Sequence, residues 1–216
     1  MAPPADDRNR QSGDWIELVV TLILVFAAVA TSWSGYQAAR WHGEQAAGTN
    51  RTGAIRFEAA RAAGRADAQT EIDVATFIAW VDADRTGQDE LADIFEARFR
   101  PEFRTAFDAW TATQPFTSAD APPSPFAMPD YRLASRDLAE RLDREAAASA
   151  ADVSTDIQRA SNYVLTVVLY SVVLFFGGMS TKLRSRRLRV ALGMAALLLM
   201  LGTLVWTATF PISVSV

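Results

Sequence analysis

The chain of 216 residues contains no cysteine, one histidine and one lysine. Without cysteine it can form no disulfide bond, offer no thiol nucleophile and bind no metal through thiolates. The single histidine, His42, together with scattered serines gives no pattern for a Ser-His-Asp triad. A glycine-rich phosphate-binding loop is also missing. These absences remove most of the motifs by which enzymes are recognised in a sequence, so we expect no catalytic activity and no cofactor.

Charged residues are absent from three long apolar stretches, at residues 18–39, 160–181 and 190–210. About 20 residues rising ~1.5 Å each are enough to cross a hydrocarbon core of ~30 Å. We therefore predict an integral membrane protein with transmembrane helices at 15–39, 160–181 and 190–210. Pumps, proton-coupled transporters and voltage sensors need ionisable groups inside their spans, and this pattern argues against those classes.

The orientation is predicted from a short basic loop between the second and third spans. Residues 182–189 contain Lys182, Arg184, Arg186, Arg187 and Arg189. Short, strongly basic loops stay on the cytoplasmic side of a membrane. We predict a cytoplasmic N-terminus, with residues 40–159 and the C-terminal tail, 211–216, outside the cytoplasm. The excess of arginine over lysine and the abundance of alanine are typical of GC-rich bacterial genes, so we expect a bacterial inner membrane.

The N-terminal region leaves one alternative open. Residues 1–14 are polar and rich in proline, aspartate and arginine, which predicts disorder. The first span has a second interpretation as a cleaved signal peptide, because Ala28-Val29-Ala30 resembles a cleavage site after an apolar stretch. Acidic residues before the span and the apolar run beyond Ala30 argue against cleavage. Either interpretation leaves residues 40–159 on the same side.

The insert at 40–159 is predicted to be a helical bundle, so the fold class is all-α. Val74, Phe77, Ile78 and Val81 recur with the spacing of one helix face, and no segment alternates as a strand does. We expect two long arms that continue the first and second spans, capped by two short helices. The insert carries 14 basic and 21 acidic residues, a net charge of −7. This acidic balance argues against nucleic-acid binding.

Small residues recur at four-residue spacing along the first span and beyond it, at Ala27, Thr31, Gly35, Ala39, Gly43 and Ala47. Such spacing lets two helices approach closely. A four-residue step drifts about 40° around the helix, so a straight partner can follow only part of the row. We expect the alanine-rich arm around 146–151 as the partner. A homo-oligomeric contact and an alanine bias without a structural role are the alternatives.

One loop resembles the calcium-binding loop of EF-hand proteins, which uses oxygen ligands at fixed positions and glycine at the sixth. The candidate ligands are Asp82, Asp84, Thr86 and Asp93, with Gly87 at the sixth position. Aspartate replaces the usual glutamate at the twelfth position, and no second such loop is present. We expect no tight calcium binding and interpret the loop as an acidic corner between two helices. His42, without a second histidine, is not expected to bind a metal.

Three motifs carry a resemblance to a family. The stretch 33–45 reads WSGYQAARWHGEQ, residues 100–103 read RPEF, and residues 121–129 read APPSPFAMP. They resemble hallmarks of uncharacterised bacterial membrane proteins with three spans. The resemblance covers most of the chain and implies no activity. The arrangement also resembles the four-helix sensor domains of bacterial chemoreceptors, except that the second span here leads to a basic loop and a third span.

These observations favour a non-enzymatic interaction or scaffold protein of the inner membrane. Its expected partners are the lipid bilayer and either another membrane protein or further copies of the chain. Two alternatives remain. One is a ligand-sensing helical bundle that signals to a membrane partner. The other is a small oligomeric pore lined by polar residues of the first span, such as Thr21, Thr31 and Ser32.

Overall fold

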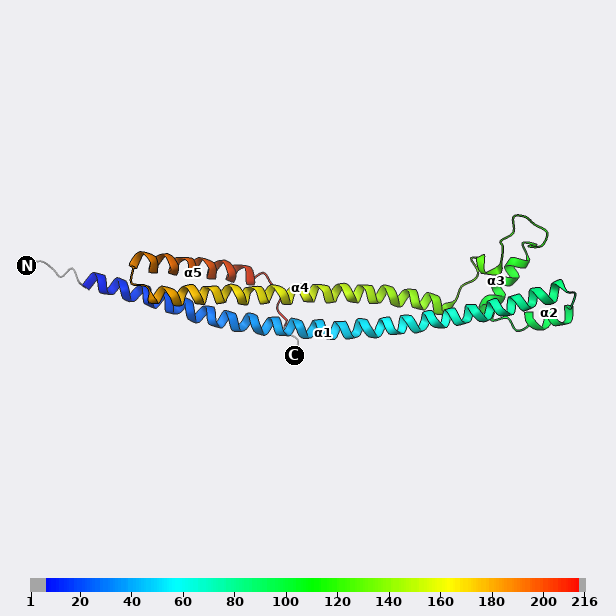
Figure 1. The fold of residues 1–216 in the computed structure, drawn as a ribbon, viewed down its shortest axis with the longest axis horizontal. Coiled ribbons are helices and arrows are strands. Elements are labelled where there is room, and N and C mark those ends of the chain that lie inside the picture. Colours follow the sequence, from blue (N-terminus) through cyan, green and yellow to red (C-terminus); the bar gives the residue numbers. More distant parts are fainter. Residues whose placement is uncertain (1–6, 214–216) are drawn as a thin grey trace, which may run out of the picture. The chain divides into compact units, whose positions relative to one another are not determined.

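The computed structural model describes residues 7–213, and these are almost entirely helical (Figure 1). In chain order the elements are α1 (Asp7–Arg85), α2 (Asp89–Glu96), α3 (Pro101–Thr111), the 3-10 turn η1 (Pro125–Ala127), α4 (Ala134–Lys182) and α5 (Arg186–Thr207). The described part of the chain contains no strand, which confirms the all-α prediction. The predicted disorder of residues 1–14 is replaced by helix from Asp7 onward, and residues 1–6 lie outside the described part.

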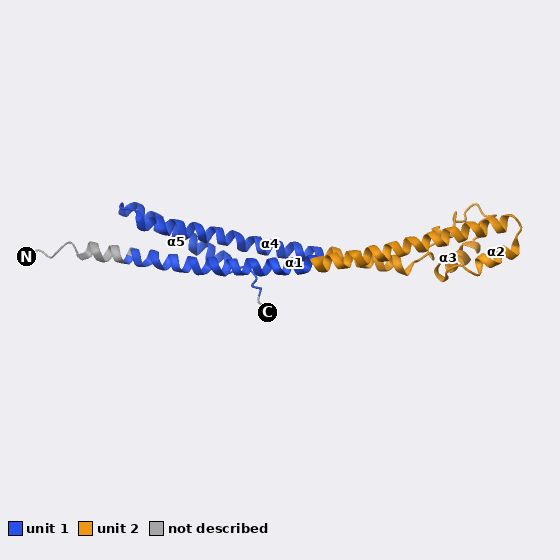
Figure 2. Ribbon diagram, turned by 60° about the horizontal axis from the view of Figure 1, so that its bottom comes forward, with its two compact units in different colours: residues 1–49, 150–216 blue, residues 50–149 orange. Residues whose placement is uncertain are grey.

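The chain divides into two compact units (Figure 2). Unit 1 comprises residues 1–49 and 150–216, and unit 2 comprises residues 50–149. Helices α1 and α4 each contribute residues to both units. Unit 2 is therefore shorter at both ends than the predicted insert of 40–159.

Unit 1 contains the apolar parts of α1, α4 and α5, which lie side by side (Figure 1). Each of these three helices is long and apolar enough to cross a membrane, as the sequence predicted. Their shared core includes Ala27 from α1, Val173 from α4 and Ala196 from α5. A Cβ atom at Gly177 of α4 would come within 2.8 Å of the Leu24 side chain, so this glycine permits a close helix approach.

A second cluster in unit 1 holds residues 210–213, which follow α5. Trp41 of α1 and Tyr163 of α4 are buried there against Phe210, which follows α5. The Tyr163 hydroxyl donates a hydrogen bond to the Pro211 carbonyl at 3.1 Å. The backbone N–H of Ser213 donates to Oε1 of Gln37 at 3.1 Å. The segment after α5 is thereby held against both α1 and α4.

In unit 2, the α1 and α4 arms pack through small residues. The buried positions are Ala59, Ala62 and Ala66 on α1 and Ala139 and Ala146 on α4. Hydroxyl groups of Thr52 and Ser149 lie 2.7 Å apart across this contact. Alanine has no side-chain entropy to lose on burial, so two long helices can pack closely here at little entropic cost.

Short helices cover the end of α1 in unit 2. Gly87, with φ of +71°, makes the turn after α1 in a backbone conformation that favours glycine. Pro101 occupies the first turn of α3, where its missing N–H costs nothing. The described helices thus match the predicted arms and caps. α1 also runs unbroken through Gly48, Gly53 and Gly64.

Candidate functional site

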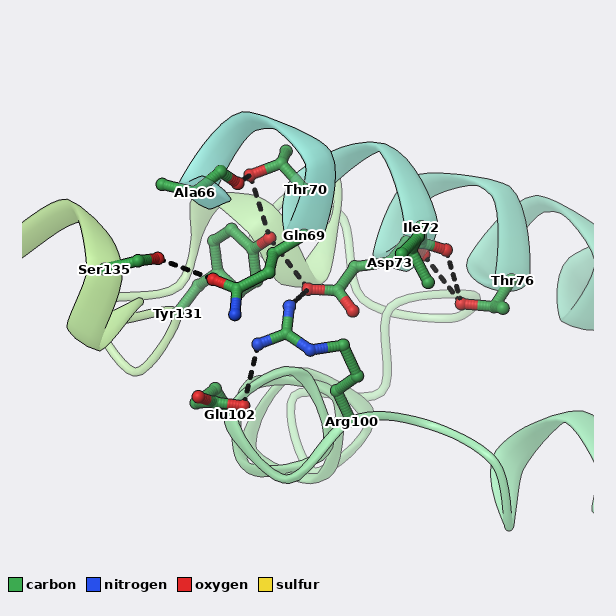
Figure 3. A network of polar contacts seen from close by, with 10 residues as sticks. All are labelled: Ala66, Gln69, Thr70, Ile72, Asp73, Thr76, Arg100, Glu102, Tyr131 and Ser135. Atoms are coloured by element: carbon green, nitrogen blue, oxygen red, sulfur yellow. Dashed lines mark hydrogen bonds and ion pairs between the residues drawn. The ribbon is translucent and has the colours of Figure 1, made fainter. Parts of the chain in front are cut away.

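Unit 2 contains a buried carboxylate, Asp73, on the side of α1 that faces α3 (Figure 3). Its side chain is only 1% exposed. Arg100 donates from Nη1 to Asp73 Oδ2 at 3.1 Å, and the Tyr131 hydroxyl donates to the same oxygen at 3.0 Å. The other oxygen, Oδ1, has no hydrogen-bond partner. A buried charge is costly unless it is paired, so these two donors are what allow Asp73 to occupy this position.

Arg100 connects α1 to the beginning of α3. It precedes Pro101 and has the extended backbone that a following proline favours, with φ of −64° and ψ of 145°. Its Nη2 donates to Glu102 Oε2 at 2.9 Å. The Arg100 side chain is 20% exposed, so the ion pair with Asp73 is shielded from most of the solvent.

Tyr131 joins the same group from the segment that precedes α4 (Figure 3). Its hydroxyl lies 3.4 Å from Thr70 Oγ1, and its ring packs edge-on against Phe103 and Phe126. Four residues further on, Ser135 donates to Gln69 Oε1 at 2.5 Å. We refer to Thr70, Asp73, Arg100, Glu102 and Tyr131 as the Asp73 network.

Burial is the largest influence on the titration of this network. It raises the pKa of the Asp73 carboxyl above the ordinary value of 3.8, and the Tyr131 hydrogen bond and the Arg100 charge offset this only in part. Burial also raises the pKa of the Tyr131 hydroxyl, so Tyr131 remains a donor at neutral pH. Shifted carboxyl groups occur in acid–base sites and in structural networks alike. Here Arg100 and Tyr131 use their donors on Asp73 and its neighbours, as in a structural network.

An aromatic cluster adjoins the Asp73 network. Its buried members include Trp80, Phe99, Phe103, Phe107 and Trp110. Rings meet edge to face, as in the pair Trp80–Phe107 at 4.7 Å and the pair Phe99–Phe103 at 4.8 Å. This is the favourable geometry for aromatic pairs. Trp110 also donates from Nε1 to the Pro122 carbonyl at 2.8 Å, which fixes the proline-rich loop on the cluster.

A second feature of unit 2 is an exposed apolar face of α1. Phe57, Ile72 and Ile78 are 63%, 54% and 61% exposed. At about 100° per residue these three side chains fall within a sector of about 120°, opposite the alanines that face α4. A Cβ atom added to either Gly53 or Gly64 would meet nothing within 4 Å. We define the α1 outer face as Gly53, Phe57, Gly64, Ala68, Ile72, Ala75 and Ile78, all of them exposed.

The row of small residues predicted from the sequence does not lie on one face of α1, so some of its members are buried and others are exposed. Ala27 is fully buried between the spans, and Thr31 is half-buried. Gly35, Ala39, Gly43 and Ala47 are exposed, and a Cβ at Gly35 or Gly43 would meet nothing within 4 Å. The expected packing of Gly43 on the second arm is therefore wrong. Four steps of about 40° carry the row from the buried side at Ala27 to the opposite side at Gly43.

The segment that resembles a calcium-binding loop is mostly helical, with a turn at Thr86 and Gly87. α1 continues to Arg85 and α2 begins at Asp89, so Asp82 and Asp84 lie in the last helical turn rather than in a loop. The Thr86 hydroxyl donates to the Asp82 carbonyl at 2.7 Å, and Asp93 lies within α2. In the described residues no group of three or more acidic or histidine side chains is placed to hold a metal ion. His42 is exposed, with Nδ1 3.1 Å from Gln45 Oε1.

The sequence did not predict the Asp73 network as a site, although Arg100 and Glu102 belong to the motif RPEF. Asp73 directly precedes Val74 and lies four residues before Phe77. In the sequence, the one indication of this site was an acidic residue, Asp73, next to an apolar helix face. Its partners lie 27 and 58 residues away, which local periodicity cannot indicate.

Comparison with protein-family models, with curated proteins and with solved structures gives no match to this chain.

Proposed function

We propose that the chain is a non-enzymatic membrane interaction or scaffold protein that binds a helix of a partner membrane protein along the α1 outer face. The observation that supports this is the exposure of Phe57, Ile72 and Ile78 on one side of α1. Exposed apolar residues grouped on one side of a surface are typical of interaction sites, and here they share that side of α1 with the charged residues Arg61 and Glu71. Arg61, whose guanidinium lies 5.3 Å from the Phe57 ring centre, covers only part of this face.

The shape of the face favours a helix as the occupant. It is one helix face wide and extends from Gly53 to Ile78, which corresponds to about 38 Å at ~1.5 Å per residue. A globular partner would contact only part of such a narrow strip, whereas a helix can follow it. The open positions at Gly53 and Gly64 allow the backbone of a partner helix to come close.

The Asp73 network supports a non-catalytic role for unit 2. Asp73 is its most buried carboxylate, and its known donors come from residues that join α1 to α3 and to the segment before α4. In this interpretation the network and the aromatic cluster hold the short helices on α1. The network then serves the fold of unit 2 rather than a reaction.

For the cellular location we propose a bacterial inner membrane, with the N-terminus in the cytoplasm and unit 2 outside it. The support is the basic connection between α4 and α5, which contains Lys182, Arg184 and Arg186. Arg189 donates from Nη2 to the Leu183 carbonyl at 3.0 Å, so one further cation is held at this end of the spans. Cations concentrated in a short loop favour the cytoplasmic side.

Site-specific photocrosslinking in native membranes tests the partner. A photoreactive amino acid is placed at Ile72 or Ile78, and the matched control carries it at Ala63, an exposed position about 120° around the helix from Phe57 in the middle of the face. We expect the same discrete adduct with one membrane protein from Ile72 and Ile78, and none from Ala63. Ile72→Glu should reduce the Ile78 adduct, because a charge in the contact would be buried without a partner.

Two results would contradict this proposal. Adducts of twice the chain mass at Ile72 and Ile78 would replace the hetero-partner with a second copy of the chain. The absence of any adduct from both positions, in protein that retains its helical circular dichroism, would show that the α1 outer face is not an interface.

A further inference from the structure

Unit 1 contains a groove of about 390 Å³ between α1, α4 and α5. Its rim consists of exposed apolar side chains: Phe26, Val29 and Trp33 from α1 and Leu204 from α5. Its floor includes Tyr163 and Tyr170 of α4, which are buried. The volume lies within the range of small-molecule sites, which are about 300–1,000 Å³.

One end of this groove has a hydroxyl group without a hydrogen-bond partner. Ser34 lines the groove, is fully buried, and its Oγ has no partner. Gln37 Nε2 and Trp41 Nε1, further along the same side of α1, are also buried without partners, although these two residues do not line the groove. Buried polar atoms are normally paired, so the Ser34 hydroxyl indicates a missing acceptor in the groove.

The other hydroxyl groups of the groove are already paired. The Thr207 hydroxyl donates to the Thr203 carbonyl at 2.8 Å and lies 3.3 Å from the Tyr170 hydroxyl. Tyr163 donates to Pro211. Among the hydroxyl groups that line the groove, that of Ser34 can therefore offer a hydrogen bond to a ligand, while Trp33 contributes an indole ring at the exposed rim. The remainder of the groove suits an apolar chain.

The position of the groove along the span agrees with a membrane lipid. Its apolar part begins at Phe26 and its polar end is at Ser34, about 12 Å further along α1 at ~1.5 Å per residue. Trp33 and Tyr36, whose rings are 6.0 Å apart, lie at the same level as Ser34. Such aromatic residues are typical of the membrane–water interface. Beyond them, the Arg159 guanidinium lies 4.7 Å from the Trp41 ring centre, and it also donates to Asp156 Oδ1 at 3.1 Å, so the polar end is lined by an ion pair.

We propose that this groove binds one acyl chain of a membrane glycerophospholipid. The chain lies along Phe26, Ala30 and Leu204, and its ester carbonyl accepts a hydrogen bond from the Ser34 hydroxyl. The acceptor-rich headgroup is then on the side of Trp41 and Arg159. A glycerophospholipid supplies an apolar chain for the groove and an ester carbonyl at the level of Ser34. The Ser34 hydroxyl, which has no partner within the protein, then has an acceptor. The site goes beyond the proposed partner contact, because it is formed by unit 1 alone.

The test uses the full chain, delipidated in detergent and offered dioleoyl phosphatidylethanolamine, with native mass spectrometry to measure the lipid retained. Ala30→Phe fills the groove, and Ala28→Phe places the same ring on the exposed opposite side of α1. We expect one lipid per chain in the wild type and in Ala28→Phe, and a severalfold loss in Ala30→Phe. Equal retention by the two variants would overturn the groove as the site.

The hydrogen bond has its own test. An ether-linked analogue of the same lipid lacks the carbonyl, so it should bind the wild type about 3- to 10-fold more weakly than the ester lipid. Ser34→Ala should remove this difference without affecting the ether lipid. An equal affinity of the wild type for both lipids would overturn the Ser34 contact.

The occupant is tested with two competitors, oleate and a short-chain isoprenoid quinone. Preferential retention of either one would overturn the glycerophospholipid.

If Ala30→Phe loses its helical circular dichroism, a diazirine in the acyl chain of the lipid decides the question on the wild-type chain. Adducts on Ala30 or Leu204 would support the groove, whereas adducts mainly on Val25 or Val205, which are exposed outside it, would overturn it.

Discussion

Asp73 is the residue whose burial demands the most from its surroundings. Two donors reach one of its oxygens, from Arg100 and Tyr131, and these come from segments 27 and 58 residues further along the chain. If the segment of Arg100 or of Tyr131 moves away from α1, Asp73 loses that hydrogen bond. A buried carboxylate of this kind makes the correct arrangement of unit 2 more favourable relative to partly assembled ones, because those would leave the charge unpaired.

Removal of Arg100 should therefore destabilise unit 2 strongly. Breaking a buried ion pair costs about 3–5 kcal/mol, and we expect a value near the lower end because Arg100 is 20% exposed. The variant is Arg100→Met, followed by the near-ultraviolet circular dichroism of the aromatic cluster during chemical unfolding. The control is Arg136→Met, since the Arg136–Asp67 pair is exposed on both sides and should contribute less than about 1 kcal/mol. Equal effects of the two variants would contradict a special role for Arg100.

The raised pKa of Asp73 predicts a pH dependence of stability. Folding raises this pKa above 3.8, so the folded chain holds the proton more tightly than the unfolded chain. The free energy of unfolding gained from this group is fully present below pH 3.8 and is lost as the pH rises through the folded-state pKa. Compared with Asp73→Asn, the wild type should gain stability as the pH falls through that window. A relative loss of stability would show that the attraction of Arg100 outweighs burial.

At the scale of helices, a small residue permits close packing only where it faces the neighbouring helix, however many small residues the helix contains. Gly48 of α1 lies against α4, where a Cβ would come within 2.7 Å of Val153 Cγ2. Gly43, five residues earlier, has open space around it. Close approach of the two helices therefore depends on Gly48, although Gly43 belongs to the more regular sequence pattern.

Alanine substitutions separate these two glycines. Gly43→Ala should stabilise the chain by up to about 1 kcal/mol, because alanine favours the helix over glycine. Gly48→Ala gains the same propensity but forces the stiff Val153 side chain to shift, and we expect it to be about 1–3 kcal/mol less stable than Gly43→Ala. Thermal unfolding in one detergent measures both. Similar melting temperatures would indicate that the contact at Gly48 adapts without strain.

The helices were predictable because their signals are local. The uncharged runs predicted the three spans, and the acidic corner that contains Gly87 predicted the turn after α1. The pairing of faces was not predictable, since periodicity shows which side of a helix is apolar and not what covers it. Gly43 was assigned to the wrong side for this reason. The Asp73 network and the unpaired donors at Ser34, Gln37 and Trp41 depend on such pairings and were missed as well.

At the scale of the whole molecule, charge is distributed unevenly along the chain. Residues 40–159 carry a net charge of −7, and the eight positions 182–189 carry five cations. Cations in short loops determine orientation, whereas acidic residues contribute little. The basic connection after α4 is therefore the strongest signal for orientation in this chain, and it supports our proposal that unit 2 lies on the opposite side of the membrane from this connection.

The absence of cysteine makes this orientation directly testable, because a single introduced cysteine is the only thiol. Ser118 in unit 2 and Ser185 before α5 are both exposed. We expect Ser118→Cys to react with a membrane-impermeant maleimide in cells with a permeabilised outer membrane. Ser185→Cys should react only after the inner membrane is also opened. Both variants should react equally in detergent, which controls for accessibility. The reversed pattern would place the basic connection outside and unit 2 in the cytoplasm, and a partner for the α1 outer face would then have to be sought there.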